Sequence, residues 1–135
     1  MMRGAMAKAA KHPARILVVD DEEAVRTALQ KVLEKEHYVV DCARSAAEAM
    51  EKANTAAFDL VITDIVMPGV DGLALVSHLR EDNPDIQVIV MSAIAGWGQS
   101  ADALRAGAYV YLVKSAKKDA IVKVVKDALD RRPPH

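Results

Sequence analysis

Residues 16–22 of the chain carry the sequence ILVVDDE, an apolar run that ends directly on acidic residues. Four consecutive aliphatic residues predict a short strand buried on both faces. A second run of the same kind, LVITD at residues 60–64, also ends on an aspartate. Parallel strands of an open α/β sheet bring their carboxyl ends to one edge, where such sheets bind ligands. If these two strands are neighbours, Asp20, Asp21 and Asp64 converge on that edge.

Five short apolar runs alternate with stretches of helical period from Arg15 onward. This alternation is typical of βα units wound around a parallel sheet, and strands that are apolar on both faces require helices on both sides. We therefore expect an α/β protein with the doubly wound, flavodoxin-like (βα)5 fold and strand order 2-1-3-4-5. The predicted strands are Ile16–Val19, Tyr38–Cys42, Leu60–Thr63, Ile86–Met91 and Tyr109–Val113.

Several residues mark the predicted helix ends. Ser45 and Glu48 form an S-x-x-E capping box, which predicts the start of the second helix. Asn83 and Pro84 are expected to close the third helix, because the residue before a proline disfavours helical backbone. Gly107 is expected to take a left-handed conformation at the end of a short fourth helix.

Composition limits the domain organisation and the partners. A chain of 135 residues with 52% hydrophobic residues suffices for one core. We expect a domain over residues 15–130, a flexible leader over 1–14 and a tail or linker start over 131–135. A net charge of −1 provides no general attraction to nucleic acid or to a membrane. Cys42 is the only cysteine, so no disulfide forms within the chain, and a cytoplasmic location is expected.

The predicted acidic edge favours a metal ion. Carboxylates that lie close together repel one another unless a cation joins them, and Mg²⁺ prefers oxygen ligands of this kind. Lys114 follows the fifth predicted strand and would bring an ammonium group to the same edge, where it can neutralise a phosphoryl oxygen. Each aspartate alone could instead be a helix cap or turn former, and the lysine could simply be solvated.

Four segments together resemble the receiver domains of two-component response regulators, the CheY-like family. The resemblance covers about Arg15 to Asp130, and the order and spacing of its motifs are specific. The segments are ILVVDDE at 16–22, DLVITDIVMPGVDG at 59–72, MSA at 91–93 and GAY at 107–109 leading to Lys114.

The resemblance implies a role for each residue of the acidic edge. Asp64 would accept a phosphoryl group from a sensor histidine kinase or a histidine phosphotransfer protein. Asp20, Asp21, Asp64 and the backbone carbonyl of Val66 would bind Mg²⁺, and Lys114 would offset charge on the phosphoryl oxygens. Such a domain is a signalling module rather than an enzyme, although it catalyses its own phosphoryl transfer and dephosphorylation.

The resemblance also implies a switch. Ser92 would bind the phosphoryl group through its hydroxyl, and Tyr111 would change rotamer in response. The signal would reach a downstream protein target, or a second copy of the chain, through the face of the fourth helix, fifth strand and last helix. Tyr111 could instead be an ordinary half-buried strand aromatic. Tyr109 shares its sheet face, and only the family spacing favours Tyr111.

The sequence departs from the family pattern at three positions. Ser115 stands where most members have a proline joined by a cis peptide bond. A cis bond before a non-proline residue costs about 3 to 4 kcal/mol, so we expect a trans Lys114-Ser115 bond and a less certain direction for the lysine. Val66 and Ile94 are apolar and cannot orient a water molecule, so we expect slow hydrolysis of the acyl phosphate.

Three other functions remain as alternatives. An aspartyl phosphatase of the haloacid dehalogenase type would need a D-x-D motif, whereas this chain has Asp20-Asp21 at the first strand and Val66 two residues after Asp64. A nucleotide-binding flavodoxin-like protein would need a glycine-rich phosphate loop, and none follows any of the predicted strands, so this function is disfavoured. A receiver-like interaction module that is never phosphorylated is the strongest alternative. The missing proline keeps this alternative open, whereas the intact set of site residues argues against it, namely Asp20, Asp21, Asp64, Ser92 and Lys114. We expect no direct contact with nucleic acid from this chain.

Overall fold

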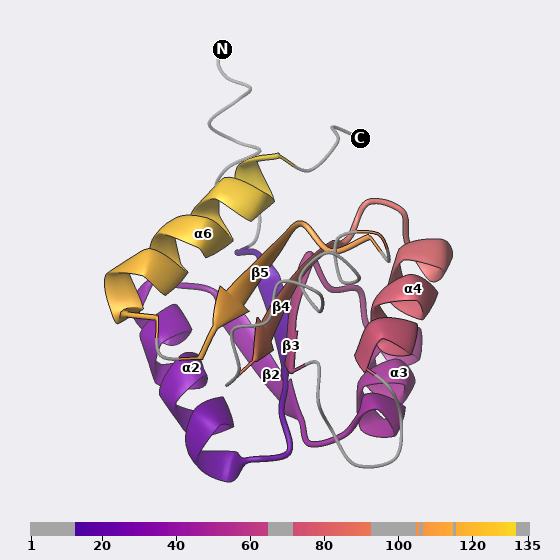
Figure 1. Cartoon of the computed structure of the whole chain (residues 1–135), viewed down its shortest axis with the longest axis horizontal. Helices are drawn as coiled ribbons and strands as arrows, with labels where there is room; N and C mark the ends of the chain where they lie inside the picture. Colours follow the sequence, from indigo (N-terminus) through magenta and orange to yellow (C-terminus); the bar gives the residue numbers. More distant parts are fainter. Residues whose placement is uncertain (1–12, 65–71, 93–104, 106, 115, 132–135) are drawn as a thin grey trace.

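The computed structural model describes residues 13–64, 72–92, 105, 107–114 and 116–131 (Figure 1). Strands and helices alternate along the chain as the sequence predicts. The elements are β1 (Arg15–Val19), α2 (Glu23–Lys35), β2 (Val39–Ala43), α3 (Ala46–Thr55), β3 (Leu60–Asp64), α4 (Gly72–Asp82), β4 (Gln87–Ser92), β5 (Val110–Val113) and α6 (Lys118–Asp130).

The strands form one parallel sheet in the order β2-β1-β3-β4-β5. This order confirms the predicted flavodoxin-like topology. Helices α2 and α6 cover one face of the sheet, and α3 and α4 cover the other (Figure 1). Because β1 and β3 pair directly, with Val19 opposite Thr63, the residues that follow them lie at the same edge of the sheet.

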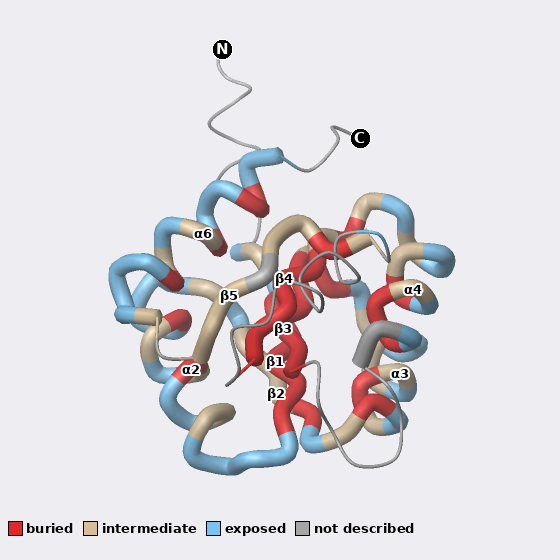
Figure 2. The backbone as a smooth tube through the Cα atoms, viewed as in Figure 1, coloured by how far each residue is buried: buried red, intermediate tan, exposed pale blue. Residues whose placement is uncertain are grey.

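The core consists of two apolar layers, one on each side of the sheet. Alternate residues of a strand point to opposite faces, so Ile16 and Val18 pack under α2 and α6, whereas Leu17 and Val19 pack under α3 and α4. Figure 2 shows the buried residues concentrated along the central strands. This packing holds the strand ends in fixed register.

The observed strand boundaries differ from the predicted ones by about one residue. β2 begins at Val39 rather than Tyr38, because the Tyr38 N–H donates to the carbonyl oxygen of Leu33 at the end of α2. β4 begins at Gln87, since the Ile86 N–H closes a turn onto Asn83. β3 and β4 each extend one residue further than predicted, to Asp64 and Ser92, so both polar residues belong to the ladder itself.

The predicted helix signals are mostly confirmed. The Ser45 hydroxyl accepts the Glu48 N–H at 3.1 Å and caps α3. The Glu48 carboxylate accepts the Arg44 N–H at 2.7 Å, one residue before the cap. Gly107 has φ +116°, in the region that favours glycine. Most of the predicted fourth helix lies outside the described residues.

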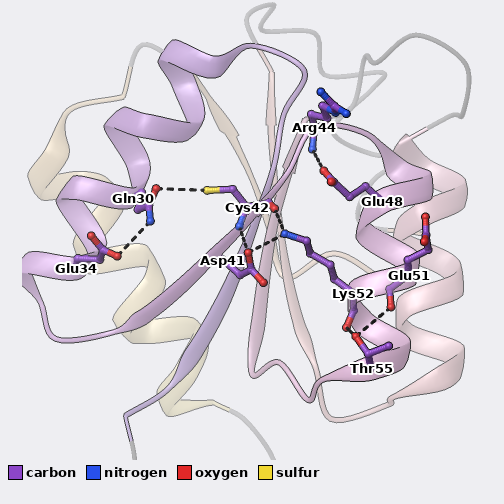
Figure 3. A network of polar contacts seen from close by, with 9 residues as sticks. All are labelled: Gln30, Glu34, Asp41, Cys42, Arg44, Glu48, Glu51, Lys52 and Thr55. Carbon is purple, nitrogen blue, oxygen red and sulfur yellow. Dashed lines mark hydrogen bonds and ion pairs between the residues drawn. The ribbon is translucent and has the colours of Figure 1, made fainter.

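The edge strand β2 is tied to both neighbouring helices by polar contacts (Figure 3). Lys52 of α3 donates to the Asp41 carboxylate at 2.8 Å and to the Cys42 carbonyl oxygen at 2.6 Å. The Cys42 thiol lies 3.8 Å from the side-chain oxygen of Gln30 in α2. A charged group on an edge strand also discourages pairing with another sheet.

The helices in the described ranges are all too short or too polar to cross a membrane. The predicted leader and tail fall outside the described residues, except for residues 13, 14 and 131.

Candidate functional site

The sheet brings two aspartates and a lysine to its carboxyl edge. Asp20 follows the Val19–Thr63 pair directly, so it lies level with Asp64 on the neighbouring strand. Lys114 follows the Val113–Ser92 pair, and its backbone N–H donates to the Ser92 carbonyl oxygen at 2.8 Å. The predicted convergence is therefore present in the fold.

Asp20, Asp21 and Asp64 form one carboxylate cluster. Each of them offers an oxygen, and these oxygens lie within 4.8 Å of one another. Asp20 and Asp64 are buried, with 2% and 5% of their surface exposed, whereas Asp21 is exposed. Octahedral Mg²⁺ with bonds of about 2.1 Å separates its ligand oxygens by roughly 2.9 to 4.2 Å, so small side-chain movements would let the cluster share one ion.

Lys114 contacts the inner part of this cluster. Its ammonium nitrogen lies 2.8 Å from Asp20 Oδ2 and 3.0 Å from Asp64 Oδ2. A third carboxylate, that of Glu22, lies 3.2 Å away. The lysine side chain therefore reaches Asp64 although Ser115 follows it. The predicted trans bond to Ser115 lies outside the described residues.

One ammonium group shared by three carboxylates leaves an excess of negative charge. Burial raises the pKa of the Asp20 carboxyl, although hydrogen bonds from Lys114 and from the Glu22 N–H act in the opposite direction. Burial alone would lower the pKa of Lys114, but its hydrogen bonds to Asp20, Asp64 and Glu22 raise that pKa above the ordinary value. The raised pKa keeps the Lys114 ammonium group protonated. Its single positive charge compensates the negative charge of the carboxylates only in part. A divalent cation would remove that deficit.

The remaining predicted residues divide into two groups. Ser92 is 1% exposed and lies in β4 at the same edge as Asp64. Tyr111 lies in β5 opposite Val90, but its side chain is outside the described part of the chain, as are Val66 and Ile94. The metal-ligand role of Val66, the switch role of Tyr111 and the expected slow hydrolysis stay predictions.

Sequence reasoning missed Glu22 and Arg26. The Arg26 guanidinium donates to the Asp20 carbonyl oxygen at 2.7 Å and fixes the turn after β1. Arg26 lies one helical turn beyond Glu22, so an i, i+4 pairing of opposite charges was the available signal. That signal predicts a contact between these two side chains, whereas each binds another part of the site.

A family model decides the classification. The model described as the response regulator receiver domain matches residues 16–126, which include every site residue named above. The chain belongs to this family. Receiver domains are signalling domains, and they typically bind Mg²⁺ at an acidic pocket, which corresponds here to the cluster of aspartates.

Similar proteins support the same assignment. The receiver domain is 36% identical over 114 residues to the transcriptional regulatory protein ZraR of Klebsiella oxytoca, covering 84% of this chain and 26% of ZraR. It superposes on a CheY-like receiver domain of Methanospirillum hungatei with a TM-score of 0.84 and 30% identity, covering 87% and 94% of the two chains. The response regulator TrrA of Thermotoga maritima, solved in complex with Mg²⁺ and BeF, gives a TM-score of 0.78 and 36% identity, with coverages of 85% and 98%.

The receiver domain spans about a quarter to a half of the length of the transcriptional regulators that it matches. The similarity concerns the receiver part of those proteins.

Proposed function

We propose that this receiver domain accepts a phosphoryl group on Asp64 in a Mg²⁺-dependent reaction. The contact between the buried Asp64 carboxylate and the Lys114 ammonium group, at 3.0 Å, beside the carboxylates of Asp20 and Asp21, is the observation that carries this proposal. An Asp64 oxygen would attack the phosphorus atom, and the bond between phosphorus and the donor histidine nitrogen would break. The product is an acyl phosphate on Asp64.

The residues around Asp64 suit a reaction that depends on position and charge. Phosphoryl transfer places negative charge on the equatorial oxygens, and catalysis consists mainly of alignment and electrostatic stabilisation. Lys114 supplies a positive charge, because its raised pKa keeps the amine protonated. Ser92 lies at the same strand end and offers a hydroxyl group for the phosphoryl oxygens.

Asp20, Asp21 and Asp64 would hold the metal ion, with the Val66 carbonyl as a further ligand. Their oxygens are close enough to share one octahedral ion, and one ammonium does not balance their charge. Mg²⁺ would supply positive charge at the phosphoryl oxygens. The similarity to TrrA, which was solved with Mg²⁺ and BeF, supports this choice of metal.

The phosphoryl donor would be a sensor histidine kinase or a histidine phosphotransfer protein. Ser92 and Tyr111 would then transmit the modified state to a downstream protein, or to a second copy, through the face that includes β5 and α6. The working unit would be residues 15–130, located in the cytoplasm. The domain would also catalyse loss of its own phosphoryl group, as a signalling module with no separate substrate.

Intact mass after incubation with acetyl phosphate and Mg²⁺ tests the proposal. We expect a gain of about 80 Da, the mass of one phosphoryl group, that disappears with excess EDTA and in Asp64→Ala. Asp59→Ala is the matched control, because Asp59 precedes the same strand at its opposite end and should leave the gain intact. Absence of any gain in the wild type would favour the interaction module that is never phosphorylated.

A further inference from the structure

Glu22 occupies the N-cap position of α2 without capping the helix. Its backbone is extended, with φ −97° and ψ 118°, and its side chain makes no cap hydrogen bond. Shorter acceptors such as aspartate or serine are preferred at this position because they reach the first helical N–H groups. The Glu22 carboxylate instead contacts Lys114, which is 92 residues away in sequence, at 3.2 Å. The Glu22 side chain therefore contacts the site and does not cap the first turn of α2.

This contact differs from the other two contacts of Lys114 in burial. The side chains of Asp20 and Asp64 are 3% and 6% exposed, whereas that of Glu22 is 63% exposed. Glu22 therefore lies on the solvent side of the ammonium group. Glu22 also lies outside the carboxylate cluster that can share one ion.

The backbone under Glu22 is held firmly. Its N–H donates to Asp20 Oδ1 at 2.9 Å, and its carbonyl oxygen accepts the N–H groups of Val25 and Arg26, both at 3.2 Å. The Arg26 side chain binds the carbonyl oxygen of Asp20 in the same turn. These hydrogen bonds fix the backbone position from which the Glu22 side chain reaches the Lys114 ammonium group.

We propose that Glu22 is a positioning residue that retains the Lys114 ammonium group at the site when Asp20 and Asp64 bind the metal ion. The inference rests on the proposed function, because that function assigns both inner carboxylates to Mg²⁺. Before the ion binds, Lys114 has three carboxylate partners, and loss of one of them matters little. After the ion binds, Glu22 is the remaining partner among the three. It therefore stabilises the ion-bound state more than the ion-free state.

Mg²⁺ affinity measured by calorimetry gives the first test. Glu22→Gln keeps the length of the side chain and removes its charge, so we expect the Mg²⁺ dissociation constant to rise about two- to fivefold, the range that a partly exposed ion pair supports. Glu23→Gln is the matched control, because it removes the same charge from the next residue, at an exposed position in the first turn of α2. An equal rise in both variants would overturn the inference, since it would reflect only general attraction to the ion.

A double-mutant cycle with Lys114→Met gives the decisive test. If Glu22 acts through Lys114, the effect of Glu22→Gln on the dissociation constant falls to that of Glu23→Gln once the ammonium group is absent. An undiminished effect of Glu22→Gln in the Lys114→Met background would show that Glu22 acts on the ion directly, and the inference would be wrong.

A serine variant separates positioning from folding. Glu22→Ser supplies a good N-cap, so we expect resistance to urea to be equal or greater while Mg²⁺ affinity falls as in Glu22→Gln. If Glu22→Ser binds Mg²⁺ with the same affinity as the wild type, the inference is wrong. Wild-type protein that binds Mg²⁺ and gains a phosphoryl group, but shows no Glu22–Lys114 coupling, overturns the inference alone. Wild-type protein that does neither overturns the proposed function and the inference together.

Discussion

Asp20 is a buried residue whose charge is only partly compensated. Its raised pKa means that the folded state binds a proton more tightly than the unfolded chain, so this group destabilises the fold as pH rises through the folded-state pKa. In the absence of divalent cations we expect Asp20→Asn to raise the free energy of unfolding at pH 7, because the neutral amide does not bury a charge that Lys114 compensates only in part. The gain should shrink as the pH falls through the raised folded-state pKa and be absent below the ordinary value of 3.8, where the carboxyl is protonated in both states.

Urea unfolding of the wild type and of Asp20→Asn, at pH values from about 3.5 to about 7.5, measures the difference in their free energies of unfolding. Glu51→Gln serves as the control, because Glu51 is an exposed carboxylate in the middle of α3, and its removal should change stability little at any pH. Lower stability of Asp20→Asn at pH 7 without divalent cations would show that Lys114 fully compensates the aspartate.

Gly107 is confined by its backbone and by a neighbour. Its φ of +116° is unfavourable for any residue with a Cβ atom, and a Cβ placed there would lie 3.0 Å from Cγ of Arg80. We expect Gly107→Ala to lower the free energy of unfolding by about 2 kcal/mol. In an Arg80→Ala background the loss should be smaller but still present, because the backbone strain stays. Equal thermal stability of Gly107→Ala and the wild type would contradict this interpretation.

Helix α2 ends in a Schellman motif built around a histidine. The Tyr38 N–H donates to the Leu33 carbonyl oxygen, the His37 N–H donates to that of Glu34, and His37 has φ +70°. Because glycine takes this conformation without strain, His37→Gly should raise the free energy of unfolding by about 0.5 to 1 kcal/mol despite its greater freedom in the unfolded chain. Chemical denaturation measures the gain. Glu36→Gly, at an ordinary φ of −90°, should give no gain, and a gain of the same size there would contradict the argument.

Strands and helices could be predicted from the sequence where the pattern of apolar residues reflects burial. The apolar runs that became β1 and β3 are buried on both faces, so their composition alone indicates the strands. The end of α2 was harder to predict, because His37 fills a position that glycine usually marks. The start of β2 depends on the same motif, since Tyr38 is held by the helix end rather than by the sheet.

The whole molecule explains which site residues the sequence could identify. Asp20, Asp21 and Asp64 were found because the strand order alone brings strand ends together. The strand order also predicted that Lys114 lies at this edge, because β5 pairs with β4. The direction of the Lys114 side chain next to Ser115 was not predictable, since strand order does not fix a side-chain conformation. Glu22 escaped notice because its partner is distant in sequence and its own position suggests a helix cap.

Metal binding should be visible in the stability of the whole domain. A ligand that binds only the folded state at 100 times its dissociation constant adds about 2.7 kcal/mol to the free energy of unfolding. We expect such an increase with Mg²⁺ and none with NaCl of equal ionic strength. Asp21→Asn removes an exposed carboxylate of the cluster and should abolish most of the increase. The same increase in Asp21→Asn would place the ion elsewhere.

The central claim is that Asp20, Asp21 and Asp64 share one divalent ion at the sheet edge. Anomalous diffraction from crystals grown with Mn²⁺, which accepts similar oxygen ligands, tests it most directly. The account predicts one strong peak within about 2.3 Å of carboxylate oxygens of Asp21 and Asp64, with Asp20 bound directly or through water. A peak at another surface, or none at saturating Mn²⁺ while Lys114 stays between Asp20 and Asp64, would contradict it.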